Sequence, residues 1–250
     1  KTSDFLTFSE SHVILPSGGA DALDFNVYTG SVVREGSQFH AYYTGQNPRI
    51  LDPVTGEPLQ VVLHAVSDDG QQRWQRVSED VLRAPSWIEP SDWRDPFVRQ
   101  CQEDGSWQML LAARRRQGPH RRRGLIVEAV ADSAAGPWGD IRPFWEPGLY
   151  MAHECPDLFE MDGLWYLVYS EYSEAFTTRY RRATSARGPW ELPDLDTLDG
   201  RAFYAAKTAE LDGRRFAFGW ISTRTGETDS GAWEWGGCLA VHEIHQQADG

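Results

Sequence analysis

The chain contains the stretch LFEMDGLWYLVY at residues 158–169, in which two apolar, aromatic-rich segments flank the dipeptide Asp162-Gly163. Aromatic and β-branched residues favour strands because their side chains pack well on a pleated surface. Asp-Gly is a favoured two-residue turn of a β-hairpin because both central positions need a positive φ. The stretch therefore predicts an antiparallel hairpin.

The same pattern occurs three more times along the chain. A short apolar segment, a turn and an aromatic segment recur around Glu35-Gly36, Asp104-Gly105 and Asp212-Gly213. Gly136-Pro137-Trp138 and Gly188-Pro189-Trp190 each follow a further strand-like segment. Repeats of roughly 50–60 residues with about four strands each indicate the blades of a β-propeller.

A propeller makes a prediction that a plain antiparallel sandwich, the alternative fold, does not make. The innermost strand of every blade lines one central channel, so polar residues just before these strands would converge on one opening. We therefore interpret the chain as an all-β propeller. Similar residues at the same place in successive repeats favour this fold over the sandwich.

Composition argues against several classes of function. The net charge of −13 leaves no basic face for nucleic acid. The one basic cluster, Arg114–Arg116 with Arg121–Arg123, is interpreted as a solvated hairpin loop around Gly118-Pro119, with a phosphate or partner site as the alternative. Three widely spaced cysteines form neither a disulfide framework nor a CxxC metal motif.

The compartment and the oligomeric state stay open at this stage. No apolar run is long enough to span a membrane, and no signal peptide is visible, which favours the cytoplasm. The sequence opens on Lys1 rather than Met, so a missing leader is an open alternative.

Two acids lie just ahead of predicted inner strands, in Trp93-Arg94-Asp95-Pro96 and His153-Glu154-Cys155-Pro156-Asp157. Hydrolysis of an acetal needs one carboxyl group that protonates the leaving oxygen and another that attacks or stabilises the sugar cation. Glu154, with its longer side chain, fits the acid/base. Arg94 would keep Asp95 ionised and donate to sugar hydroxyls. The alternative is a surface ion pair worth at most about 1 kcal/mol.

These motifs resemble those of glycoside hydrolase family 32, the invertases, inulinases, levanases and related fructosyltransferases. Arg94-Asp95-Pro96 is similar to the family's Arg-Asp-Pro motif and Glu154-Cys155-Pro156 to its Glu-Cys-Pro motif. Weaker matches in the same order extend the likeness over essentially the whole chain: Lys1 to Pro16, Tyr28-Thr29-Gly30-Ser31, Phe203-Tyr204-Ala205, Gly219-Trp220-Ile221 and Trp235-Gly236-Gly237.

The resemblance implies a five-bladed propeller over residues 1–250, with the first blade incomplete at the N-terminus and without the family's C-terminal β-sandwich. It implies a retaining β-fructofuranosidase that uses Glu154 as acid/base and Asp95 as transition-state stabiliser. Neither a metal nor a cofactor is expected, and the partner would be a small fructoside. The residues expected to bind substrate are Arg94, Tyr28, Thr29, Tyr204 and Trp235.

The chain also departs from the family pattern. The family's nucleophile is an Asp in an Asn-Asp-Pro-Asn-Gly type of motif, which Asp4, Asp21 and Asp24 do not match, so we expect it upstream of Lys1. A fructosyltransferase, a catalytically silent carbohydrate-binding propeller and an enzyme acting on arabinosides or other furanosides are alternatives. Neither the particular fructoside nor its chain length follows from these motifs.

Overall fold

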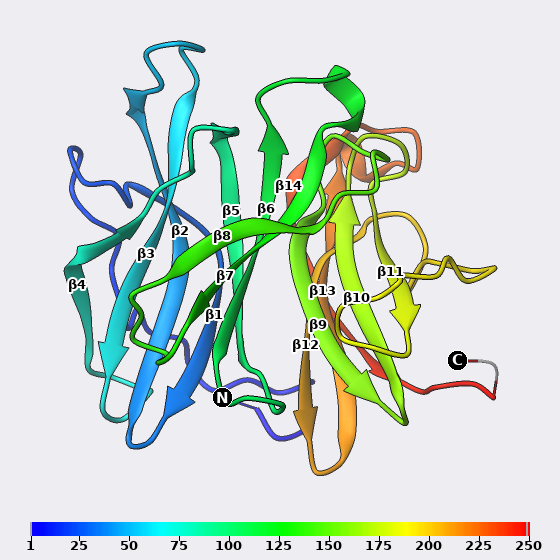
Figure 1. Ribbon diagram of the computed structural model, residues 1–250. Coiled ribbons are helices and arrows are strands. Elements are labelled where there is room, and N and C mark those ends of the chain that lie inside the picture. Colours follow the sequence, from blue (N-terminus) through cyan, green and yellow to red (C-terminus); the bar gives the residue numbers. More distant parts are fainter. Residues whose placement is uncertain (1, 249) are drawn as a thin grey trace. The chain divides into compact units, whose positions relative to one another are not determined.

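The computed structural model describes residues 2–248 and 250, except for the side chain of Trp235. Its regular structure consists of β-strands and two short 3-10 helices (Figure 1). The chain divides into two compact units. The first comprises Lys1–Arg116 and Val127–Pro143, and the second comprises Gln117–Ile126 and Phe144–Gly250.

Four antiparallel sheets make up the fold, and we number them along the chain as blades 1 to 4. In each blade, strands that follow one another in sequence are hydrogen-bonded neighbours. Blade 1 contains β1 (Asn26–Glu35), β2 (Gln38–Leu51), β3 (Pro58–Ser67) and β4 (Trp74–Leu82). Blade 2 contains β5 (Ile88–Gln100), β6 (Trp107–Arg115), β7 (Gly124–Ala131) and β8 (Gly139–Trp145), with helix η1 (His120–Arg122) before β7.

Blades 3 and 4 have three strands each. Blade 3 contains β9 (Glu154–Met161), β10 (Leu164–Glu171) and β11 (Thr177–Ala183). Blade 4 contains β12 (Phe203–Leu211), β13 (Arg214–Arg224) and β14 (Trp233–Ile244), with helix η2 (Thr225–Glu227) before β14. A fourth strand is absent from blade 3 within the described residues, where Glu191 forms only an isolated bridge to Arg182. Pro193, which lacks an N–H, interrupts this pairing, and a second isolated bridge between Thr197 and Arg179 follows it.

The four predicted hairpins are confirmed as β1–β2, β5–β6, β9–β10 and β12–β13. In the third hairpin Asp162 and Gly163 have φ values of 48° and 83°, and in the fourth Asp212 and Gly213 have 53° and 73°. Both central residues are therefore left-handed, as a tight hairpin turn requires. These turns are dictated by their own residues.

The prediction of five blades is wrong, because the described chain contains four. Residues 2–25, which we expected to close a first blade, form no strand. They are held instead by side chains from blade 1: Asn47 donates to the carbonyl groups of Ala20 and Ala22 at 2.9 and 2.8 Å. Asp24 is buried and accepts from Arg76 at 2.8 Å. Hydrogen bonds of this kind satisfy the backbone of an irregular segment without a strand partner.

The basic cluster is less solvated than predicted. Arg114 forms an ion pair with Glu89 at 2.5 Å, and the Arg115 guanidinium lies 4.6 Å from the ring centroid of Trp87. Arg116 donates to the carbonyl of Ile88 at 3.1 Å. Only the segment 117–122 is exposed throughout. The first three arginines therefore belong to the packing of blade 2.

Candidate active site

A β-bulge interrupts the first hairpin of every blade at the same place. In blade 2 the paired residue Arg94 is followed by Asp95 and Pro96, which together face one residue of β6. Blades 3 and 4 repeat this arrangement after Glu154 and after Tyr204, and blade 1 has a single extra residue after Tyr28. We call the last paired residue the pairing position and the next residue the bulge position.

Six of the predicted site residues occupy the pairing or the bulge position of their blades. The pairing positions are Tyr28, Arg94, Glu154 and Tyr204, and the bulge positions are Thr29, Asp95, Cys155 and Ala205. Every candidate except Trp235 is in this set. Trp235 belongs to β14, and its side chain lies outside the described structure.

The sequence placed the two acids at one common position of the repeat, and this register is wrong by one residue. Asp95 is structurally equivalent to Cys155, and Glu154 is equivalent to Arg94. Pro96 and Pro156 occupy the same place in the two bulges, and Asp95 directly precedes its proline whereas Glu154 lies two residues before its own. The acids therefore occupy adjacent positions of the repeat rather than the same one.

The bulge position has a left-handed backbone in three blades. The φ values are 59° at Asp95, 50° at Cys155 and 54° at Ala205. Such a conformation costs about 1–3 kcal/mol in a non-glycine residue and often occurs at functional sites. Because Ala205 carries no reactive group, the strained conformation is a property of the blade. The chemistry comes from the side chains that it presents.

Hydroxyl groups from the preceding blade hold two of these bulges in place. The N–H of Asp95 donates to Thr44 Oγ1 at 2.8 Å, and the N–H of Ala205 donates to Ser170 Oγ at 2.9 Å. Thr44 and Ser170 lie on the second strands of blades 1 and 3 and are fully buried. The repeated contact satisfies a backbone donor that the bulge removes from the strand ladder.

Asp95 lies in a buried, charged environment in the first unit. Its carboxylate Oδ2 is 3.8 Å from Arg94 Nε, and both side chains are buried. Arg94 also donates from Nη1 to Asp92 at 2.7 Å and to Gln60 at 3.2 Å. Burial distinguishes this group from the surface ion pair considered as the alternative, because a charge held away from water must be paired.

Thr29 joins this group, and Tyr28 lies apart from it. The carbonyl of Thr29 accepts from the same Thr44 hydroxyl that receives the Asp95 N–H, at 3.2 Å. Tyr28 is 38% exposed, and its hydroxyl donates to Gln46 at 2.9 Å. The structure thus brings Arg94, Asp95 and the Thr29 backbone together through Thr44, a residue for which the sequence carried no signal.

Glu154 and Tyr204 meet in the second unit. The Tyr204 hydroxyl donates to Glu154 Oε2. The Tyr204 ring is buried and stacks on Phe176, with centroids 4.3 Å apart and planes 9° apart. Phe176 stacks in turn on Trp233 at 5.7 Å, and the Arg224 guanidinium lies 3.5 Å from the Trp233 centroid. This stack fixes the Tyr204 ring and therefore the donor that faces the Glu154 carboxylate.

Asp157, the last residue of the Glu154 motif, has a structural role. It is buried and accepts from the N–H and the hydroxyl of Thr208 in blade 4, at 2.7 and 3.1 Å. Burial raises the pKa of the Asp157 carboxyl, while Lys207 and Thr208 act in the opposite direction. The residue therefore couples blade 3 to blade 4.

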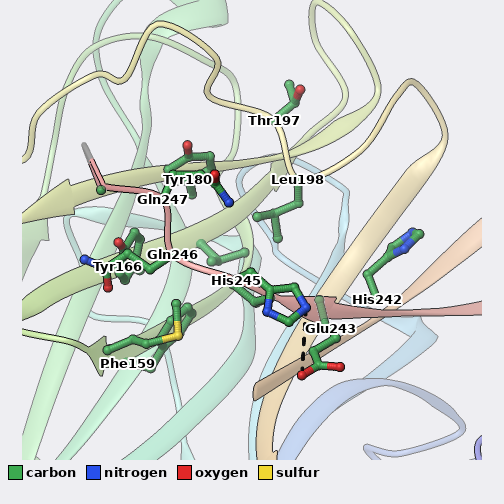
Figure 2. Close-up of a pocket in the computed structure, with 15 residues that line it drawn as sticks. Phe159, Tyr166, Tyr180, Thr197, Leu198, His242, Glu243, His245, Gln246 and Gln247 are labelled. Atoms are coloured by element: carbon green, nitrogen blue, oxygen red, sulfur yellow. Dashed lines mark ion pairs between the residues drawn. The ribbon is translucent and has the colours of Figure 1, made fainter. Parts of the chain in front are cut away.

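A cavity of about 330 Å³ in the second unit contains none of the predicted site residues (Figure 2). It lies between blade 3 and the end of the chain, with Phe159, Tyr166 and Leu198 on its apolar side. Its charged lining includes Glu243, which is 3.8 Å from His245. We do not assign the candidate chemistry to this cavity.

Asp95 and Glu154 belong to different units. That the two carboxyl groups converge on one opening therefore stays a prediction, based on the repeated blade pattern. Within residues 2–248 and 250, no group of three or more His, Cys, Asp or Glu residues is placed to hold a metal ion. None of the helices in the described part of the chain is long and apolar enough to cross a membrane.

The fold is similar to that of several solved glycoside hydrolases. A Bombyx mori family 32 β-fructofuranosidase in complex with sucrose superposes with a TM-score of 0.65 at 18% identity over 87% of this chain. A xylan β-1,4-xylosidase from Bacillus halodurans gives 0.67 at 14% over 91%, and an α-L-arabinofuranosidase from Lactobacillus brevis gives 0.63 at 12% over 90%. The chain spans 48%, 43% and 74% of these proteins, respectively.

These similarities and the four sheets support the predicted all-β propeller fold. No curated protein sequence matches the chain. The model of the glycosyl hydrolases family 32 N-terminal domain matches residues 1–245, so the chain belongs to this family.

Proposed function

We propose that the chain carries the acid/base and the transition-state stabiliser of a retaining glycosidase that cleaves β-fructofuranosidic bonds in sucrose or fructans. The observation that carries the proposal is the common placement of six predicted site residues at two adjacent positions of the repeat. Family membership supports the reaction class, and the sucrose complex of the Bombyx mori relative supports the substrate class.

Each proposed role follows from the surroundings of the side chain. Glu154 protonates the leaving oxygen and later removes a proton from water. Tyr204, which donates to Glu154, holds its carboxyl group in place. Asp95 accepts hydrogen bonds from sugar hydroxyls as positive charge develops on the ring, and Arg94 supplies donors beside it. A retaining enzyme also needs a carboxylate nucleophile, a role that we assign to no residue of this chain.

Substrate choice provides the test of the proposal. The full-length protein that contains this chain should release fructose from sucrose, inulin or levan. Aryl β-xylosides and aryl α-arabinofuranosides serve as comparison substrates, because xylosidase and arabinofuranosidase folds are similar to this one. Longer oligosaccharides at high sucrose would indicate transfer rather than hydrolysis. Turnover of the pentosides alone would overturn the fructoside assignment, and sugar binding without turnover would favour a silent propeller.

Replacing Tyr204 with Phe separates positioning from substrate binding. We expect kcat to fall about tenfold with KM nearly unchanged, because a hydrogen bond to a charged group contributes about 1.5 kcal/mol. The ring stack on Phe176 is retained in this variant. Steady-state kinetics on the best fructoside measures both constants. A raised KM at constant kcat would show instead that the hydroxyl binds the substrate.

A further inference from the structure

The cavity beside blade 3 has a largely apolar wall. Its volume is about 330 Å³, at the small end of the range of ligand pockets, which is about 300–1,000 Å³. Most of its apolar lining belongs to the hydrophobic cluster of blade 3: Phe159, Met161, Tyr166, Val168, Tyr180, Leu198 and Ile244. Apolar side chains of this kind favour contact with an apolar ring over contact with water.

The charged side chains of the lining are paired with one another or with groups outside the cavity. Glu243 accepts from Arg214 Nε at 2.8 Å and lies 3.8 Å from His245. His242 lies 2.9 Å from Asp199. A charged ligand would compete with these pairs and would lose its hydration in a largely apolar space. The lining therefore favours a neutral ligand.

Gln246 provides a hydrogen-bond acceptor at this cavity. It follows the end of β14 by two residues and is among the lining residues drawn in Figure 2. Its Oε1 atom is buried and accepts no hydrogen bond from the part of the chain that the structure describes. Because a buried acceptor is costly without a donor, a ligand with one N–H or O–H group would gain a contact here.

We propose that the cavity binds a small neutral molecule with one apolar ring and one hydrogen-bond donor, of which phenol is the simplest example. The ring packs on the wall around Phe159 and Leu198, and the donor contacts Gln246 Oε1. A sugar fits less well, because each of its hydroxyl groups needs a partner that an apolar wall does not supply. The lining contains neither Asp95 nor Glu154, so this inference does not depend on the function proposed for them.

A bound ring would join segments that are far apart in the sequence. Phe159 and Val168 belong to β9 and β10, whereas Ile244 and Gln246 belong to the end of β14 and to the residues after it. A ligand that needs both sides binds the folded protein and not the unfolded chain. Phenol should therefore raise the midpoint of thermal unfolding as its concentration increases.

The test uses the full-length protein that contains this chain, with phenol and toluene as probes. Both have a ring of the same size, but toluene has no hydrogen-bond donor. Gln246→Leu removes the acceptor, and the matched control Gln247→Leu removes the exposed neighbouring amide, which also lines the cavity. Isothermal titration calorimetry measures the affinity of each protein for each probe.

We expect Gln246→Leu to weaken phenol binding about tenfold while toluene binding changes less than about threefold, because only phenol loses a hydrogen bond. In Gln247→Leu both affinities should stay within about twofold of wild type. Leu198→Phe, which fills part of the cavity, should weaken both probes, because the added ring occupies their space.

Crystals soaked with phenol and fructose together identify the occupant directly. We expect the phenol ring in this cavity with its hydroxyl at hydrogen-bond distance from Gln246 Oε1. A cavity that holds only water or a sugar would overturn the proposal. So would equal losses of phenol and toluene affinity in Gln246→Leu, or phenol binding that Leu198→Phe leaves unchanged.

Discussion

Replacing Glu154 with Gln is expected to lower kcat/KM for sucrose or fructan by about 10²–10⁴-fold, the usual contribution of a general acid/base. Gln is close in size and keeps an oxygen that can accept the Tyr204 hydrogen bond. The fold should therefore be retained, which circular dichroism and thermal unfolding can check. The loss follows from the missing proton alone.

The leaving group distinguishes a general acid from a binding residue. A fructoside with an acidic phenol as leaving group needs little protonation, so its first step should be much less impaired in Glu154→Gln. In Asp95→Asn, by contrast, natural and aryl substrates should lose rate to a similar degree, because stabilisation of the ring cation is common to both. Equal losses for both substrates in Glu154→Gln would refute the acid assignment.

The matched control is Glu160→Gln on the same strand. Glu160 is exposed and accepts from the N–H of Gly163 at 2.6 Å, in the hairpin turn at the other end of β9. This variant loses the same charge from the same strand, so its activity should stay within about twofold of wild type. An equal loss in Glu160→Gln would attribute the effect to net charge or stability.

Replacing His153 with Phe is expected to stabilise the folded protein, with the largest stability change of the variants considered. The stabilisation should increase in acid. His153 is fully buried, and neither ring nitrogen has a hydrogen-bond partner. Aromatic rings surround it, with Trp145 and Tyr169 each 5.0 Å away between centroids. The equivalent positions of blades 2 and 4 are Trp93 and Phe203, so this environment accepts an apolar ring. Leaving a buried polar group unpaired costs about 1–3 kcal/mol.

The sign of the pH dependence follows from the pKa of His153. Burial, followed by the charge of Arg181, lowers this pKa from 6.5 to about 3 in the folded protein. Below pH ~6.5 the unfolded chain therefore binds a proton that the folded chain does not, so stability decreases as the pH falls towards 3. At pH ~4.5 the two-unit interval corresponds to about 3 kcal/mol of lost stability.

Urea unfolding at about pH 7.5 and about pH 4.5 measures this effect. His153→Phe should be more stable than wild type at both values, and the difference should be about 3 kcal/mol larger in acid. Burial also lowers the pKa of His40 and His64, so the variant will still lose some stability. The exposed His12→Phe is the control and should follow wild type. An NMR titration that finds His153 protonating near pH 6.5 would contradict the prediction.

Much of the local structure could be read from the chain itself. Asp162-Gly163 and Asp212-Gly213 specify their hairpins because the left-handed conformations they need are a property of those two residues. The short segments around each turn pair locally. The motifs around Asp95 and Glu154 also identified the segments in which the candidate residues lie, because the chemical type of each side chain is known from the sequence alone.

The number of blades could not be read in this way. Residues 2–25 contain strand-like apolar residues, yet a strand forms only where another strand accepts its hydrogen bonds. Blade 1 instead supplies Asn47 and Arg76 as side-chain partners for this segment. The choice between strand and loop was made by contacts that the sequence of the segment does not contain.

By itself, the sequence determined the all-β class, the hairpins and the segments in which the candidate site residues lie, because turn and side-chain chemistry act within a few residues. Tertiary structure alone decided the register of Asp95 and Glu154, the burial of Arg94 and the contacts of Asp157 with blade 4. The physical reason is separation along the chain. The hydroxyl that holds the Asp95 bulge comes from Thr44, 51 residues away, and only folding brings the two together.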